Sequence, residues 1–125
     1  MRKFTICLVL VLAVTLAFST SAWSRSREAV IKVGLNIPIT GDIPKVGEGA
    51  KFASQMWLED INKAGGLEVG KKKYKVEVVI EDNESKAESA VKANTKLITQ
   101  DEVLAIVGPQ ASSQAIPAGD GGINY

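Results

Sequence analysis

Histidine is absent from this chain of 125 residues, and cysteine occurs only once, at Cys7. Without histidine, the chain lacks the side chain that most often serves as a general base and as a metal ligand. Cys7 lies at the start of an apolar run near the amino terminus, so it is lost if that run is a cleaved export signal. The rest of the chain then has no disulfide and no thiolate, which excludes enzymes that depend on these groups.

An excess of charge of either sign is also absent, with 15 Lys and Arg against 14 Asp and Glu. The only basic run, Lys71 to Lys73, follows a glycine-rich turn, which is typical of a solvated turn rather than of a docking patch. We therefore expect no nucleic-acid partner and no binding to an anionic membrane surface.

The first 22 residues are predicted to be a cleaved secretory signal peptide. Arg2 and Lys3 precede an apolar run over residues 6–18, which is short for a membrane span, and small residues follow it. Cleavage after Ala22 fits the small residues expected at such a site, and cleavage after Ser24 and an uncleaved membrane anchor are the alternatives. Export without disulfides is typical of a bacterial periplasm, so we expect the protein there.

The rest of the chain is predicted to form an α/β fold with a parallel sheet. Apolar runs at residues 30–38 and 103–108 predict buried strands, and alternation at 73–81 predicts a strand with one more exposed face, as at an edge. Helices are expected between these strands, so the order is strand, helix, strand, helix, strand. This βαβαβ order implies right-handed crossovers between parallel strands.

Each of the two helices has a recognisable end. Gly65 and Gly66 end the first helix, because glycine adopts the left-handed C-cap conformation without strain. Ser85 and Glu88 form a capping-box pattern that predicts the start of the second helix. The apolar stripe of the first helix comprises Ala50, Ala53, Met56, Trp57, Ile61 and Ala64.

The end of the chain predicts an incomplete domain. Residues 115–125 begin like a helix and then become rich in glycine. A sheet that stopped here would keep an open edge. We therefore expect residues 23–29 to be a tail and residues 30–125 to be part of the first lobe of a longer, truncated binding domain.

The loop after the last strand is the candidate binding site. Gly108 ends the strand, and a proline, small residues and the hydroxyls of Ser112 and Ser113 follow. Open α/β sheets bind ligands at the carboxyl ends of their strands. Hydroxyls and main-chain amides at a helix start favour an anion such as a carboxylate. The alternatives are that Ser112 only caps the following helix, or that a serine is a nucleophile, which here lacks a histidine partner.

No metal site and no cofactor is predicted. Asp82, Asn83 and Glu84 carry side-chain oxygens, but the loop lacks the glycine of an EF-hand and has Lys86 at its fifth position.

Five segments occur in an order and at spacings found together in one known family. They are Ile-Lys-Val-Gly-Leu-Asn-Ile-Pro-Ile-Thr-Gly at 31–41, Gly-Ala at 49–50, Asp-Ile-Asn-Lys-Ala-Gly-Gly at 60–66, Glu-Asp-Asn-Glu-Ser at 81–85, and Ala-Ile-Val-Gly-Pro at 105–109 with Ser112 and Ser113. Over residues 30–117 the chain resembles the extracellular solute-binding proteins of branched-chain amino acid ABC transporters, the leucine/isoleucine/valine-binding type.

This resemblance implies two α/β lobes that close on a ligand, with the chain forming the start of the first lobe. It implies that Ser112 contacts the α-carboxylate of the ligand, with Ala111 and Ser113 beside it. Val46 matches a position where amino-acid binders often carry an aromatic residue, so the identity of the solute stays open.

The resemblance also implies the partners of the protein. The ligand would be an amino acid or a related small solute, no chemistry would be performed, and the full-length protein would deliver its ligand to an ABC permease in the inner membrane. The ligand-sensing domain of a receptor with the same fold is the alternative. A small exported enzyme is a further one, against which the lack of histidine and cysteine counts.

Overall fold

The computed structural model describes residues 29–122, and the predicted signal peptide lies outside them. In chain order the elements are β1 (Val30–Ile37), α2 (Pro44–Lys63), β2 (Leu67–Val69), β3 (Lys72–Asp82), α3 (Ala87–Thr99), β4 (Ala105–Val107) and α4 (Ser112–Gly122). The strands form a four-stranded sheet in the order β2-β3-β1-β4. β1 is parallel to both β3 and β4, which confirms the predicted βαβαβ arrangement.

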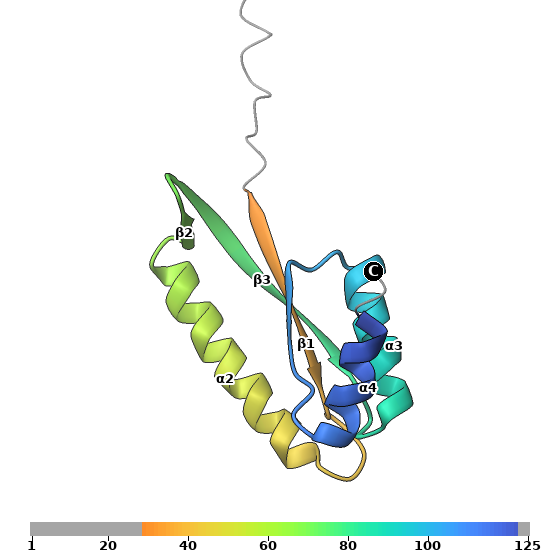
Figure 1. Ribbon diagram of the computed structural model, residues 1–125. Helices are drawn as coiled ribbons and strands as arrows, with labels where there is room; N and C mark the ends of the chain where they lie inside the picture. The colour runs from red at the N-terminus through yellow and green to blue at the C-terminus, as the bar shows by residue number, and fades with distance from the viewer. Residues whose placement is uncertain (1–28, 123–125) are drawn as a thin grey trace, which may run out of the picture.

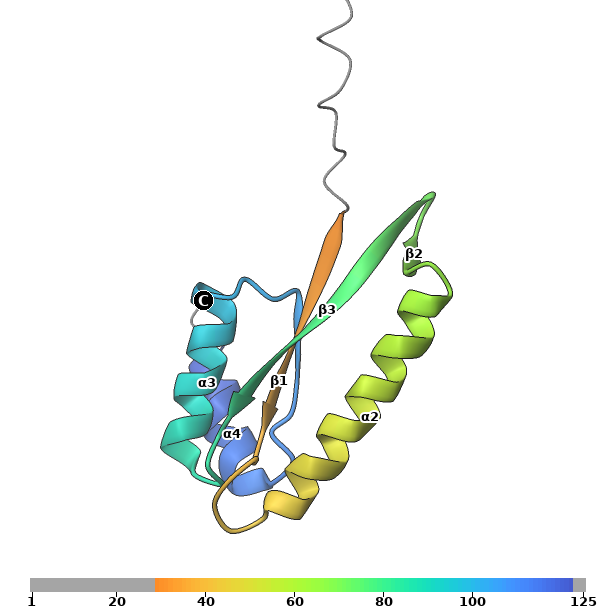
Figure 2. The same ribbon diagram turned by 180° about the vertical axis from the view of Figure 1, so that it is seen from behind.

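Helices cover both faces of the central strand. α2 lies on one side of β1 and β3, and α3 with α4 lies on the other (Figures 1 and 2). A Cβ atom built on Gly34 would lie 3.0 Å from the methyl carbons of Leu97 in α3, so this side of β1 faces α3. Leu35 and Ile37 point to the opposite side because side chains alternate along a strand, and both are buried. β1 is therefore the centre of the core.

The sheet contains one strand that the sequence does not predict. β2 pairs antiparallel with the start of β3, from Leu67 opposite Tyr74 to Val69 opposite Lys72. Gly70, in the turn between them, has a φ of 64°, which glycine adopts without strain. Sequence reasoning predicts no strand here because three residues are too few to show alternation. From Lys75 onward β3 pairs with β1, in register up to Asp82.

α2 starts earlier and packs differently than its apolar stripe predicts. It begins at Pro44, and proline suits the first turn of a helix because no amide donor is needed there. Met56 and Trp57, expected on the covered face, are 69% and 41% exposed. The start of the helix lies instead close against the residue that follows β1, since a Cβ atom on the buried Gly47 would lie 2.1 Å from the carbonyl oxygen of Pro38. Of the predicted stripe, only Ala50 and Ile61 are half-buried, and the less exposed face of the helix also includes Gly47, Ser54 and Leu58.

The predicted capping box at the start of α3 is wrong. Lys86 takes the N-cap position, and no side chain caps the helix. Ser85 has a φ of 58° and joins two loops instead. Its hydroxyl donates to the carbonyl of Thr40 at 2.9 Å and accepts from the amide of Ile43 at 3.2 Å. The Ser85 hydroxyl therefore bonds to the β1–α2 loop instead of capping α3.

The last strand and the last helix also differ from their predictions. β4 is limited to its three residues, shorter than the apolar run at 103–108. α4 continues through Pro117 and the glycines that follow, where the sequence predicts that a helix breaks down. α4 packs mainly on α3. Among the described residues, no helix is both long and apolar enough to cross a membrane.

Candidate functional site

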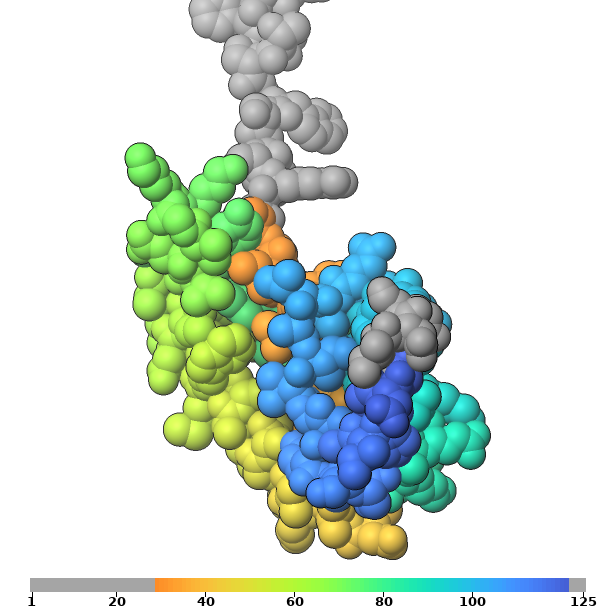
Figure 3. Space-filling model, viewed as in Figure 1, coloured from red at the N-terminus to blue at the C-terminus, as the bar shows by residue number. Residues whose placement is uncertain are grey.

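Three loops meet at the carboxyl edge of the parallel strands. They are the β1–α2 loop, the β3–α3 loop and the β4–α4 loop, and each follows a strand that points to this edge. The start of α2 and the start of α4 therefore lie at the same end of the molecule (Figures 1 and 3). This is the edge at which open α/β sheets bind their ligands.

The start of α4 presents unpaired donors at this edge. The carbonyl of Ala111 accepts the amides of Gln114 at 3.0 Å and Ala115 at 2.8 Å, which makes Ala111 the N-cap residue. The amides of Ser112 and Ser113 precede the first helical hydrogen bond, and both residues are exposed. Within residues 29–122 their hydroxyls make no hydrogen bond. Two hydroxyls and two amides at the positive end of a helix suit a carboxylate.

Ser112 lies inside α4 rather than at the N-cap position. Capping by its side chain therefore does not account for its hydroxyl. The structure brings Ala111, Ser112 and Ser113 together in one turn. It places Val46 separately, in the first turn of α2 at the same edge, where 46% of the residue is exposed.

Asp82 holds the other two loops of the edge together. Its Oδ1 accepts the amides of Ile39 at 2.9 Å, Thr40 at 3.2 Å and Glu84 at 2.8 Å, and its Oδ2 accepts the Thr40 hydroxyl at 2.6 Å. Burial opposes ionisation of this carboxyl, but the hydrogen bonds outweigh it and lower the pKa of Asp82. Asp82 is thus a structural acceptor. The described residues contain no group of three or more His, Cys, Asp or Glu that could hold a metal ion.

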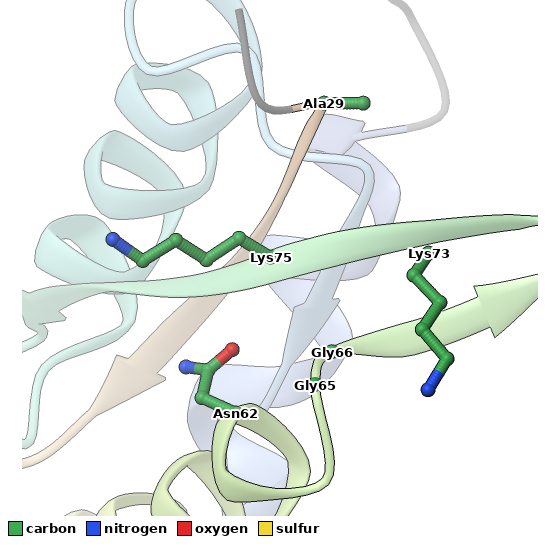
Figure 4. A pocket seen from close by; sticks show the side chains of 6 residues that line it. All are labelled: Ala29, Asn62, Gly65, Gly66, Lys73 and Lys75. Carbon is green, nitrogen blue, oxygen red and sulfur yellow. The ribbon is translucent and has the colours of Figure 1, made fainter.

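Surface hollows of similar size lie along the first half of α2 and at the opposite end of the sheet. One of about 450 Å³ runs along the first half of α2 and is lined by Ile39, Pro44, Lys45, Gly47, Glu48, Lys51, Phe52 and Gln55. Another, of about 460 Å³, lies at the amino end of β1 and is lined by Ala29, Asn62, Gly65, Gly66, Lys73 and Lys75 (Figure 4). The two lysine side chains extend in different directions in Figure 4, and Lys73 Nζ donates to the carbonyl of Ala64 at 3.3 Å. This second hollow therefore has no convergent pair of charges.

Sequence reasoning missed the buried carboxamides beneath the edge. Asn36, Asn83, Asn94 and Gln114 are all at least nine-tenths buried. The Nδ2 of Asn36 donates to the Oδ1 of Asn94 at 2.8 Å, and the Nδ2 of Asn83 donates to the Oδ1 of Asn36 at 2.9 Å. The available signal was a carboxamide, Asn36, near the end of a mostly apolar strand.

The proteins that resemble this chain in sequence and those that resemble it in structure are of the same kind. The family model described as "Periplasmic binding protein" matches residues 30–120. The Leu/Ile/Val-binding protein BraC3 of Rhizobium johnstonii is 33% identical over 109 residues, which cover 87% of this chain and 27% of that protein. An amino acid binding protein of Pseudomonas aeruginosa is 36% identical over 83 residues, covering 62% of this chain and 21% of that protein.

Solved structures show the same similarity. The branched-chain amino acid transporter substrate binding protein LivJ of Streptococcus pneumoniae, in complex with isoleucine, has a TM-score of 0.69 and 32% identity over 76% of this chain and 26% of its own. A solute binding protein of an ABC transporter from Rhodopseudomonas palustris, in complex with 3,4-dihydroxybenzoic acid, has a TM-score of 0.57 and 27% identity over 73% of this chain and 23% of its own. The chain spans about a quarter of the length of these relatives. Since the family model matches most of its residues, this chain belongs to the periplasmic binding protein family.

Proposed function

We propose that this chain supplies the carboxylate-binding edge of a solute-binding protein for ABC-type uptake of amino acids or related small solutes. The observation that carries the proposal is the start of α4, where two exposed hydroxyls and two amides without helical acceptors lie at the carboxyl edge of the sheet. Ser112 and Ser113 would donate to the carboxylate of the solute, and the turn at Ala111 would fix their direction. Val46 would lie beside the apolar part of the solute.

The proposed class of ligand is supported by the molecules bound to two structural neighbours. The protein from Streptococcus pneumoniae was solved in complex with isoleucine, and the protein from Rhodopseudomonas palustris with 3,4-dihydroxybenzoic acid. These molecules differ in their side groups but share a carboxylate, which is the group that the start of α4 suits. We propose a small carboxylic acid as the ligand, with branched-chain amino acids as the first candidates.

The proposed cellular role involves no chemistry on the ligand. Residues 1–22 would direct export and be removed, and the protein would bind its solute in the periplasm and present it to an inner-membrane permease. The signal-like start of the sequence and the names of the relatives support this role.

A titration followed by NMR tests the proposed site. L-Isoleucine should shift the amide signals of Ser112 and Ser113, whereas L-isoleucinol, in which a hydroxymethyl group replaces the carboxylate, should not. Ser112→Ala should weaken binding by about tenfold, because a hydrogen bond to a charged group is lost. Ser54→Ala is the matched control, since the Ser54 hydroxyl only donates to the carbonyl of Lys51 within α2. Equal shifts with isoleucinol, or shifts confined to other residues, would contradict the proposal.

A further inference from the structure

α4 carries the proposed site although its sequence is poorly suited to a helix. It contains Pro117 in its interior and glycine at three positions, the two residue types least favourable inside a helix. Pro117 has no amide hydrogen, so the carbonyl of Ser113 loses its helical donor. A helix this short and this weak depends on contacts with the rest of the fold.

A buried hydrogen bond from α3 supplies such a contact. The Nδ2 of Asn94 donates to the carbonyl of Ala118 in the middle of α4 at 3.0 Å, and Ala118 is fully buried. The two helices also approach closely at Gly121, where a Cβ atom would lie 3.2 Å from a methyl carbon of Val91. Both views show α3 and α4 side by side (Figures 1 and 2).

Asn94 is the last member of a directed relay of side-chain amides. The relay begins at the main-chain amide of Ser85, which donates to the Oδ1 of Asn83 at 3.0 Å. The Nδ2 of Asn83 donates to Asn36, and the Nδ2 of Asn36 donates to Asn94. A main-chain donor at one end and the carbonyl of Ala118 at the other fix which way every amide points.

Asn36 in β1 also contacts the start of the β4–α4 loop. A Cβ atom on Gly108 would lie 2.2 Å from the carbonyl oxygen of Asn36, so the loop leaves β4 in close contact with the main chain of Asn36. The loop therefore starts against the backbone of Asn36 and ends in a helix held, through Asn94, by the side chain of Asn36.

We propose that Asn94 is a positioning residue for the carboxylate site. Through its bond to Ala118 it sets how α4 lies on α3, and so it aims the amides and hydroxyls of Ser112 and Ser113 at the carboxyl edge. The role assigned to the two serines rests on the proposed function. The coupling between Asn94 and α4 does not, and it is measured without ligand.

The substitution Asn94→Asp removes the donor of this bond and also places a carboxyl group in a buried site. A carboxylate keeps the acceptor that Asn36 needs, but it places an oxygen against the carbonyl oxygen of Ala118. Asn62→Asp is the matched control, because the Oδ1 of Asn62 accepts the amide of Val76 and its Nδ2 donates to the carbonyl of Val76. The control therefore makes the same chemical change between α2 and β3, away from α4.

Amide hydrogen exchange and amide chemical shifts of the ligand-free chain give the readout. Asn94→Asp should speed exchange of the α4 amides by about tenfold or more and shift the signals of Ser112 and Ser113. Asn62→Asp should leave α4 exchange unchanged relative to α3. Unchanged α4 exchange in Asn94→Asp, or an equal change in the control, would overturn the positioning role.

Exchange of the wild-type chain in rising urea keeps the test decisive if Asn94→Asp does not fold. The side-chain amide of Asn94 and the backbone amides of α4 should lose protection together, at less urea than α3. Separate loss of protection would overturn the proposal. If the exchange results hold while isoleucine leaves Ser112 and Ser113 unshifted, the proposed function fails and the positioning role stands.

Discussion

Hydrogen bonds made by a few polar side chains hold the loops of the carboxyl edge in place. Asp82 gathers the amides of Ile39, Thr40 and Glu84 on one oxygen, and Ser85 bridges the same two loops through its hydroxyl. These side chains satisfy main-chain groups at the ends of strands and helices, and of the three amides on Asp82 only that of Ile39 has a second acceptor within residues 29–122, the carbonyl of Ile37 at 3.1 Å. The shape of the edge therefore depends on hydrogen bonding at a few positions more than on apolar burial.

The Asp82 carboxylate should make the stability of the chain depend on pH. Its pKa is lowered in the folded state, so its contribution is complete above the unfolded pKa of about 3.9 and is lost as the pH falls through the lower folded pKa. Asp82→Ala should cost about 1–2 kcal/mol of unfolding free energy at pH 7, because the amides of Thr40 and Glu84 lose their acceptor and water replaces it only in part. Urea unfolding at pH 7 and pH 3 measures this. A difference from wild type that does not shrink at pH 3 would contradict the assignment.

At the scale of elements, the start of α2 packs closely against the residue that follows β1. The Cβ of Gly47→Ala would lie 2.1 Å from the carbonyl oxygen of Pro38, so the helix would have to move. We expect Gly47→Ala to lower the free energy of unfolding by about 1–3 kcal/mol.

Gly49→Ala is the control in the same helix, because a Cβ there meets nothing within 4 Å. It should gain about 0.5–1 kcal/mol from helix propensity. Thermal unfolding of both variants measures these changes in stability. A destabilised Gly49→Ala or a neutral Gly47→Ala would contradict this packing.

The same elements show what the sequence could and could not predict. β1, β3 and α3 have clear periodicity, and their type and order were predicted correctly because local pattern and burial agree there. The sequence did not predict the role of Ser85, because its hydrogen bond to Thr40 forms only when two loops distant in sequence meet. The start of α4 had a recognisable chemistry from its serines, but the relay that ends at Asn94 needs three segments brought together by the fold.

At the scale of the whole molecule, the described chain offers an open edge rather than an enclosed site. The hollows along α2 and at the amino end of β1 are lined by residues other than Ser112 and Ser113. Sites that bind small molecules tightly bury most of the ligand surface. An exposed turn at the start of one helix can supply directional hydrogen bonds, but it cannot exclude water from the bound solute.

We therefore expect L-leucine to bind this chain only weakly. Two hydrogen bonds to a carboxylate contribute about 3–6 kcal/mol, and association costs about 4 kcal/mol or more in translational and rotational freedom. At most about 2 kcal/mol remains in favour of binding, which predicts a dissociation constant of about 30 mM or weaker. Isothermal titration calorimetry on the purified chain should thus detect little or no heat at micromolar concentrations. A micromolar affinity would show that the open edge is completed by something beyond the contacts described for Ser112 and Ser113, such as closure of another part of the chain over the solute.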